Sequence, residues 1–383
     1  MTLSQLFKSF FDSERAGGLL LIFCTVLSLL LANSFLSDNY LQLWRFEIAG
    51  HSTQHWINDC LMTVFFLLIG LELERELYVG ELADFKCAVF PLIAALGGMI
   101  VPAGIFLLFN FGTATQAGVG IPMATDIAFA IGVLSLLGSR VPVTLKVLLT
   151  AMAVMDDLGA IIIIAIFYSG ALAYSNLFMA FGIFALLIIL NRLRVHNLAP
   201  YIIGGFLMWY FMADSGVHPT ITGVLLALAI PFGDGGKKSP SFILQQLLHT
   251  PVAFLILPLF ALANTCIVIN STWYLGLASS NSIGIITGLV AGKPIGILFF
   301  SFGAVWLGMC TLPNGVRWKQ VFGVGLLAGI GFTMSIFITV LAFPQSEQIV
   351  VSKIAILIAS IIAGTLGYIW LKRVLNKPHV DVS

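Results

Sequence analysis

Residues 151–167 read AMAVMDDLGAIIIIAIF, a long apolar run that carries two neighbouring carboxylates, Asp156 and Asp157. An acidic residue at the centre of a membrane helix costs about 2.5 to 3.5 kcal/mol on the insertion scale. Two adjacent carboxylates also repel each other when both are ionised. Because ionisable residues in membrane spans usually face the protein interior and mark ion or proton pathways, the stretch predicts a buried membrane helix whose charges serve a function.

The composition extends this interpretation to the whole chain. Of its 383 residues, 59% are hydrophobic and 9% are charged. A soluble domain carries about 25% charged residues, so this chain has too few to cover a water-exposed surface. Since backbone groups in lipid must be satisfied within the protein, the long apolar runs predict an all-α polytopic membrane protein.

Apolar segments of spanning length, about 20 residues, recur along the chain and predict about twelve transmembrane helices. Gly and Pro interrupt several of them, so eleven or thirteen spans also fit the sequence. The predicted spans are residues 15–33, 56–78, 87–109, 121–138, 143–169, 172–191, 198–213, 217–232, 243–268, 282–302, 320–343 and 351–371.

The basic residues test this count independently. With the N-terminus in the cytoplasm, 15 of the 18 Lys and Arg residues fall in inner segments, Arg45 and Lys353 fall in outer loops, and Lys293 lies inside a span. The positive-inside rule requires this asymmetry. A wrong number of spans would scramble the alternation, so we expect both termini to be cytoplasmic.

Four charges lie deep in the predicted spans: Asp126, Asp156, Asp157 and Lys293. A single buried pair would be explained by helix packing. Three acids with one base leave an unbalanced set, so some of the acids must bind protons or a cation. Adjacent helical residues point about 100° apart, so the two neighbouring acids face different partners; a pair that shares one proton is the alternative.

The segments around Asp126 and Lys293 are rich in Gly and Pro, which are poor helix formers. We expect both to unwind at mid-membrane into half-helices that cross, with the carboxylate near N-terminal ends and the ammonium near C-terminal ends. Interrupted segments at matching places in two halves of a chain indicate an inverted-repeat transporter. The predicted repeats are residues 87–169 and 282–371, and residues 15–78 and 217–268 form an interface part.

The cysteines and residues 41–56 allow two further predictions. The five cysteines are scattered without His partners at ligand spacing, which favours packing residues over a metal or disulfide site. Residues 41–56, LQLWRFEIAGHSTQHW, alternate apolar and polar residues around Ala49 and Gly50. This pattern predicts a β-hairpin, and a bare surface loop is the alternative.

Six stretches closely resemble the NhaA family of bacterial sodium/proton antiporters, and the span pattern extends the resemblance over essentially the whole chain. Their combination of an Asp-Asp pair with a Thr-Asp pair and a Gly-Lys-Pro triplet is specific. The stretches are FFLLIGLELERELYVGEL (65–82), GIPMATDIAFAIGVL (120–134), KVLLTAMAVMDDLGAIIIIAIFY (146–168), GVHPTITGVLLALAIP (216–231), AGKPIGI (291–297) and GIGFTMSIFIT (329–339).

The resemblance implies roles for individual residues. Asp157 matches the principal sodium- and proton-binding carboxylate, open to a cytoplasmic funnel, and Asp156 matches the second acid, which pairs with Lys293. Thr125 and Asp126 match an unwound stretch in which the first contributes to ion binding and the second offsets helix dipoles. The resemblance also implies a pH response for Glu72, Arg75, Glu76, His218 and His249, and polar span positions for Asn58 and Asp59.

The implied activity is electrogenic exchange of Na⁺ or Li⁺ for H⁺ by alternating access, which extrudes sodium and serves sodium and pH homeostasis. Such a protein is a secondary active transporter rather than an enzyme. We expect a bacterial inner membrane, a homodimer, lipid and the transported ions as partners, no cofactor and no nucleic acid. The alternatives are a cation channel, a structural scaffold and an intramembrane aspartyl protease; the protease places its aspartates on separate helices and requires a GxGD motif, which is absent.

The sequence departs from the family pattern at Gln245 and Gln246, where a glutamate and a histidine are expected beside His249. Neither glutamine titrates, so we predict a shallower or shifted pH profile of exchange. The double variant Gln245→Glu/Gln246→His should steepen or move that profile, measured as exchange in everted vesicles between pH 6 and 9. An unchanged profile would break the link between these positions and pH activation.

Overall fold

The computed structural model describes residues 3–80, 83, 85–168, 170, 172–343 and 346–375, without the side chains of 3–15, 85–87, 139 and 346. The chain divides into two compact units. Each unit is built from segments far apart in the sequence. Unit 1 comprises Met1–Ile22, Asp84–Ala160 and Ile269–Ser383, and unit 2 comprises Phe23–Ala83 and Ile161–Val268.

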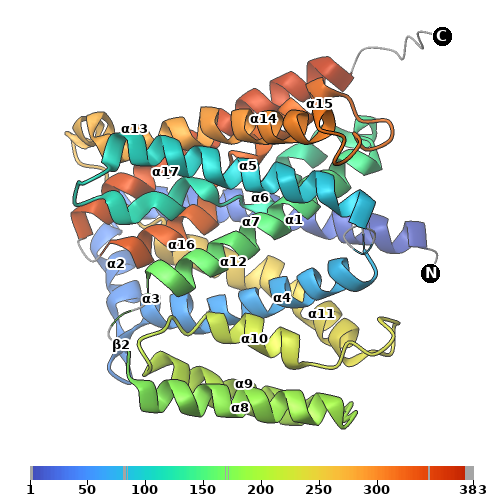
Figure 1. The fold of residues 1–383 in the computed structure, drawn as a ribbon. Coiled ribbons are helices and arrows are strands. Elements are labelled where there is room, and N and C mark those ends of the chain that lie inside the picture. The colour runs from blue at the N-terminus through green and yellow to red at the C-terminus, as the bar shows by residue number, and fades with distance from the viewer. Residues whose placement is uncertain are drawn as a thin grey trace, which may run out of the picture. The chain divides into compact units, whose positions relative to one another are not determined.

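The regular elements of unit 1 are all helices among its described residues, and they include the first parts of α1 (Leu3–Ala32) and α7 (Val143–Phe167). Figure 1 shows its helices α5 and α14 running side by side. The other elements are α5 (Phe85–Asn110), η2 (Gln116–Met123), α6 (Ile127–Ser135), η3 (Gly138–Arg140), η5 (Trp273–Ala278), α13 (Ser280–Thr287), η6 (Gly288–Gly292), α14 (Lys293–Trp306), α15 (Trp318–Ala328), α16 (Phe332–Ala342) and α17 (Ser346–Leu375).

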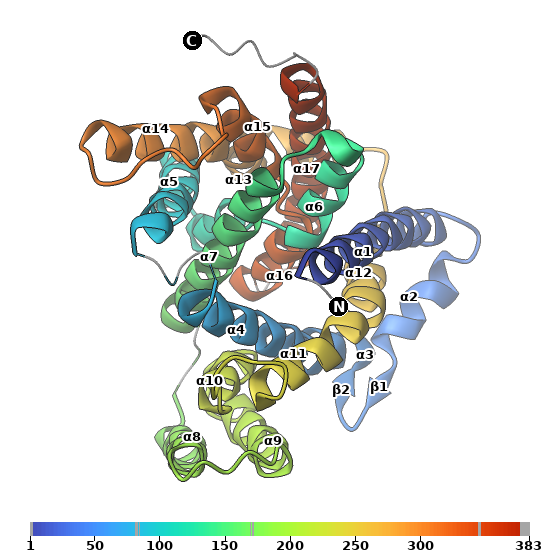
Figure 2. The same ribbon diagram turned by 90° about the vertical axis from the view of Figure 1, so that its right-hand side faces the viewer.

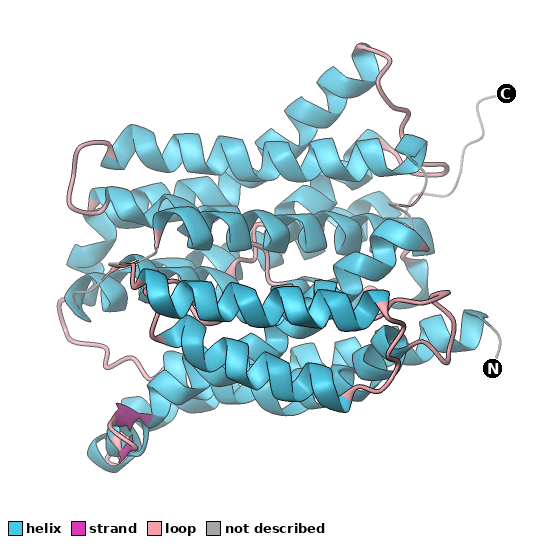
Figure 3. Ribbon diagram, turned by 60° about the horizontal axis from the view of Figure 1, so that its bottom comes forward, coloured by secondary structure: helices cyan, strands magenta, loops and turns pink. Residues whose placement is uncertain are grey.

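Unit 2 holds the remaining parts of α1 and α7, and its helices α8 and α9 lie side by side (Figure 2). A two-stranded antiparallel hairpin, drawn in magenta in Figure 3, precedes α3. The elements are α2 (Ser37–Arg45), β1 (Glu47–Ile48), β2 (His51–Ser52), α3 (Thr53–Trp56), η1 (Ile57–Leu61), α4 (Met62–Tyr78), α8 (Tyr174–Arg192), α9 (Ala199–Ala213), α10 (Ile221–Ala229), α11 (Pro240–Pro251), η4 (Val252–Ile256) and α12 (Leu257–Asn264).

The helices are those of a multi-pass membrane protein. Among the described residues, eight helices are long and apolar enough to cross a membrane, and up to ten when each bent pair counts as one span. The predicted spans 198–213 and 217–232 are present as the shorter helices α9 and α10. Helix α10 has nine residues because Pro219 precedes it and Pro231 follows its end, and Pro cannot continue a helix.

The predicted hairpin is confirmed, since Ile48 pairs with His51 across a two-residue turn. Ala49 and Gly50 both have positive φ, 52° and 84°, as a tight hairpin turn of the type I′ class requires. One basic residue lies elsewhere than predicted. Lys353 belongs to α17 and is buried, so it is not part of an outer loop.

The span around Asp126 is interrupted as predicted. The 3₁₀ helix η2 ends at Met123, Ala124 is extended, and α6 begins at Ile127 with Asp126 as its N-cap. Pro122 inside this stretch removes one backbone donor. The chain therefore exposes backbone groups in the middle of a span.

The prediction of a break at Lys293 is wrong. Residues Ser280–Trp306 form one helical span, and a single π turn, Gly288–Gly292, directly precedes Lys293. Local π adjustments let a membrane helix accommodate Pro, here Pro294. The second interrupted span is α15–α16, bent by 46° at the residues between Ala328 and Phe332, where Gly329 and Gly331 lie.

Helices α5 and α14 approach so closely that side chains are excluded between them. A Cβ added at Gly97 of α5 would collide with the carbonyl oxygen of Gly296 in α14, and a Cβ added at Gly296 would collide with that of Gly97. The two backbones are therefore in contact at these glycines. This contact brings α14, which begins with Lys293, against α5.

We predict that Gly97→Ala destabilises the protein by about 1–3 kcal/mol, because overpacking pushes the two backbones apart. The measurement is thermal unfolding of the purified protein in detergent. Gly104→Ala in α5 and Gly303→Ala in α14 are matched controls, since a Cβ at either position meets nothing within 4 Å. Equal shifts for all three variants would show that the close approach is not the cause.

Candidate functional site

Two interrupted stretches of unit 1 are hydrogen-bonded to each other. The backbone N–H of Asp126 donates to the carbonyl of Ile330 at 2.7 Å, and the Thr125 hydroxyl lies 2.9 Å from the carbonyl of Ala328. The Ser335 hydroxyl donates to the carbonyl of Ile121 at 2.7 Å. The stretch between η2 and α6 therefore lies against the break between α15 and α16.

The carboxylate of Asp126 accepts hydrogen bonds from the beginnings of two helices. Oδ1 accepts from the N–H of Phe129 in α6 at 2.9 Å, and Oδ2 accepts from the N–H of Thr333 in α16 at 3.0 Å and from the Thr333 hydroxyl. The first N–H groups of a helix lack partners within it and carry a partial positive charge. A single buried carboxylate thus caps both half-helices.

Lys293 and Asp156 form a buried ion pair, as the resemblance implied. Lys293 Nζ lies 2.9 Å from Asp156 Oδ2, with side-chain exposures of 0% and 2%. The ammonium also donates to the carbonyl of Met123, where η2 ends. The Thr125 hydroxyl lies 2.6 Å from the same Oδ2. Three elements, α7, α14 and η2, and the stretch between η2 and α6 therefore meet at this pair.

Asp157 follows Asp156 on α7 and is completely buried. Asp156 pairs with Lys293, and Asp157 is its neighbour on α7, so the two acids and the lysine form one buried group of charges. The implied opening of Asp157 to a cytoplasmic funnel is not seen, because its side chain has no exposed surface.

The charges of this cluster do not balance. Among the described buried residues of unit 1, Asp126, Asp156 and Asp157 are acids, and Lys293 and Lys353 are bases. Of these two bases, Lys293 forms an ion pair with an acid of the cluster. Buried charges are stable only when they are paired or neutralised. Oδ1 of Asp156 also accepts no hydrogen bond from the described residues, which leaves a buried oxygen available to a proton or a cation.

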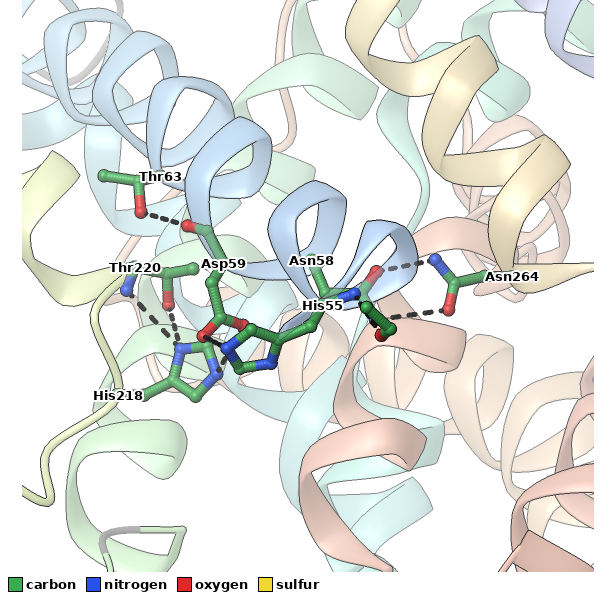
Figure 4. A network of polar contacts seen from close by, with 8 residues as sticks. His55, Asn58, Asp59, Thr63, His218, Thr220 and Asn264 are labelled. Atoms are coloured by element: carbon green, nitrogen blue, oxygen red, sulfur yellow. Dashed lines mark hydrogen bonds and ion pairs between the residues drawn. The ribbon is translucent and has the colours of Figure 1, made fainter. Parts of the chain in front are cut away.

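In unit 2, Asp59 lies between two histidines (Figure 4). Its carboxylate oxygens are 3.4 Å from His55 Nε2 and 3.9 Å from His218 Nε2. The Nδ1 atom of His218 contacts the Thr220 hydroxyl at 2.7 Å, and the Thr63 hydroxyl donates to the Asp59 carbonyl at 2.5 Å. This cluster joins η1 to the turn before α10.

Asn58 pairs with an amide that sequence reasoning missed. Asn264 Nδ2 donates to Asn58 Oδ1 at 2.7 Å, and Gln54 Nε2 donates to Asn264 Oδ1 at 3.2 Å (Figure 4 shows the asparagine pair). The three amides connect α3 and η1 to the end of α12. In the sequence, Asn264 is a single polar residue near the end of an apolar segment. Nothing in the sequence marks it as the partner of Asn58.

Four of the five residues with an implied pH response lie on α4 and α11 of unit 2, which pack against each other. The Arg75 guanidinium stacks over the ring of Phe242 at 4.5 Å from its centroid. The other members, Glu72 and Glu76 on α4 and His249 on α11, are half-buried. His218 lies apart from them in sequence and contacts Asp59 instead.

Sequence reasoning also missed the partners that complete the crossing. Thr333 and Ser335 of α16, Ser360 of α17 and the carbonyls of Met123 and Ala328 all bind residues of the predicted site or its helices. Hydroxyl groups are common in apolar helices, so residue type alone carries no signal. The two glycines of the GIGF stretch were the available sign of the second break.

Comparison with known proteins finds one family over most of the chain. Residues 8–371 match the family described as Na⁺/H⁺ antiporter 1. The chain is 61% identical to Na(+)/H(+) antiporter NhaA 1 of Flavobacterium johnsoniae, over 98% of this chain and 99% of that protein. It is 59% identical to Na(+)/H(+) antiporter NhaA of Cytophaga hutchinsonii, over 99% and 98% of the two chains.

A solved structure shares the fold at low identity. The sodium proton antiporter MjNhaP1 from Methanocaldococcus jannaschii matches with a TM-score of 0.51 and 16% sequence identity, over 98% of this chain and 96% of that one. At this identity the match concerns the fold alone.

We predict that Asp156→Asn destabilises the protein by about 3–5 kcal/mol, since it leaves the Lys293 ammonium buried without its ion-pair partner. The double variant Asp156→Asn/Lys293→Met removes both charges and should recover most of this loss. Thermal unfolding in detergent compares the two. A double variant no more stable than the single one would contradict the importance of the pair.

Proposed function

This chain belongs to the Na⁺/H⁺ antiporter 1 family and exchanges sodium ions for protons, and we propose that the two cations compete for the buried carboxylates Asp157 and Asp156. Family membership makes the chain a transporter and decides against the cation channel and the intramembrane protease. The observation that carries the proposal is the charge imbalance around Lys293: the buried acids outnumber the base that pairs with them.

Competition follows from the chemistry of the ligands. Na⁺ and Li⁺ are hard cations, which prefer carboxylate, carbonyl and water oxygens. A carboxylate binds such a cation only when it is deprotonated, so proton and sodium exclude each other at Asp157. Asp156 Oδ1 and the Thr125 oxygen are the further buried oxygens at this point. The same site then carries one cation or the other, and opposite fluxes are coupled.

A second proton makes the exchange electrogenic. If Asp157 and one group of the Asp156–Lys293 pair both release protons, more protons than sodium ions cross in each cycle, and the membrane potential drives sodium extrusion. The groups interact strongly, so the proton steps belong to the cluster rather than to one residue.

Alternating access is supported by the arrangement of unit 1. Residues 87–169 and 282–371, the proposed inverted repeats, each contain a long first span, an interrupted second span and a long third span. The interrupted members, η2–α6 and α15–α16, are the ones that hydrogen-bond to each other. Asp126 offsets the positive ends of two half-helices in this proposal, as its two caps require.

The location of the protein and its assembly follow from the basic residues and the family resemblance. The protein resides in a bacterial inner membrane with both termini in the cytoplasm, as the asymmetry of basic residues favours, and it forms a homodimer through residues 15–78 and 217–268. The half-buried charges of α4 and α11 and His218 tune the response to pH. Sodium and pH homeostasis is the resulting role.

Exchange is tested in everted vesicles with a preformed pH gradient. Addition of Na⁺ or Li⁺ should discharge the gradient, while K⁺ should not, between pH 6 and 9. Asp157→Asn should abolish the discharge, since an amide neither binds a proton nor neutralises a cation, while the variant still inserts into the membrane. Near-normal exchange by Asp157→Asn would overturn the role given to this carboxylate.

A further inference from the structure

Thr125 lies between the proposed cation site and the helix crossing. Its hydroxyl oxygen is 2.6 Å from Asp156 Oδ2 and 2.9 Å from the carbonyl oxygen of Ala328. Thr125 has no exposed surface. Because a hydroxyl carries a single proton, Thr125 donates to one of these two acceptors at a time.

The Ala328 carbonyl depends on this donor because α15 ends there. In a continuous helix the carbonyl would accept from the N–H four residues later, which belongs to Phe332. That N–H donates instead to Ser360 Oγ at 3.2 Å. The last carbonyls of a helix have no partner within it and carry a partial negative charge. The Ala328 carbonyl therefore gains a hydrogen bond when Thr125 turns toward it.

The charge of Asp156 decides which acceptor receives the proton of Thr125. Hydrogen bonds to an ionised carboxylate are roughly twice as strong as those between neutral groups, so the hydroxyl donates to Asp156 while that group is ionised and paired with Lys293. A proton on Oδ2 makes that oxygen a donor, and a bound cation draws its charge away. In either case the hydroxyl turns to the Ala328 carbonyl.

We propose that the Thr125 hydroxyl is a two-position switch that transmits the occupancy of Asp156 to the end of α15. The switch rests on the proposed function, because it takes Asp156 as a group whose charge changes during exchange. Thr125 contacts the carboxylate directly and acts on the helix through its second acceptor. It is therefore a positioning residue for the transport step.

The position of Ala328 explains why this bond affects transport. The residue borders the break at which α15 and α16 bend by 46°, and the same break is bound by the N–H of Asp126 through the carbonyl of Ile330. Turning Thr125 adds or removes one hydrogen bond at this bend. Occupied and unoccupied carboxylates then favour different arrangements of the break, as a ligand does when it binds two conformations unequally.

The switch is tested by observing the Ala328 carbonyl directly. The purified full-length protein in lipid is labelled with ¹³C at alanine carbonyls and ¹⁵N at glycine, which selects the seven Ala-Gly peptides of the chain in solid-state NMR. The Ala328–Gly329 signal is the one that is lost in Ala328→Ser. Na⁺ is added at alkaline pH, and proton release is followed with a dye under the same conditions. We expect Na⁺ to displace the proton of Asp157 and, by binding the ionised Asp156, to move the carbonyl signal.

Two variants separate the switch from a packing role. Thr125→Val keeps the shape and loses the hydroxyl. Its Na⁺ concentration is raised until protons are released, and its carbonyl signal should stay fixed at that concentration. Its exchange in proteoliposomes should fall by about 5-fold or more, the usual lower range of coupling between sites. Thr125→Ser keeps the hydroxyl and should restore both the signal change and the exchange.

The failures of the switch and of the proposed function are distinguishable. A wild-type protein that releases protons while the Ala328 signal stays fixed would overturn the switch and leave the competition intact. A signal that moves equally in Thr125→Val would overturn it as well. Absence of proton release from the wild-type protein on addition of Na⁺ would overturn the competition, and the switch with it.

Discussion

Unit 1 depends on the hydrogen bonds that satisfy backbone groups where two membrane helices are interrupted. The bilayer core contains no water, and an unsatisfied backbone group there costs several kcal/mol. Asp126 meets this requirement for both half-helices, because its two carboxylate oxygens accept from Phe129 in α6 and Thr333 in α16. Thr125, Ser335 and Ser360 satisfy further groups at the same crossing. The few polar residues of these apolar segments are thus needed as hydrogen-bond partners for backbone groups at the two interruptions.

The four residues 123–126, at the interruption between η2 and α6, also build the candidate site. Between Met123 and Asp126, one carbonyl binds the Lys293 ammonium, one hydroxyl contacts Asp156, and one carboxylate caps the crossing. A regular helix would have used the Met123 carbonyl for its own hydrogen bonding. The interruption therefore supplies ligands that a continuous span cannot offer.

The deep charges could be identified from the sequence because charged residues are rare in an apolar chain, and their cost demands a partner. The interruption of the span around Asp126 could be predicted from the sequence, but the continuity of the span around Lys293 could not. Gly and Pro are compatible with both a break and a π turn, and the turn at Gly288–Gly292 keeps the helix continuous. The break between Ala328 and Phe332 lies among apolar residues without a charge to mark it. The partners Thr333, Ser360 and Asn264 could not be found, since their hydrogen bonds exist only once distant helices pack.

Lysine at position 293 fits the proposed mechanism better than arginine would. Its compact ammonium is strongly hydrated in water and loses its proton more readily than a guanidinium when buried. The ammonium uses its donors on the Met123 carbonyl and Asp156, so it occupies the carboxylate as an internal cation. In the proposed cycle, a proton or a sodium ion must compete with this internal partner. In this proposal the Asp156 carboxylate is never left without a cation, because the Lys293 ammonium takes the place of a bound proton or sodium ion.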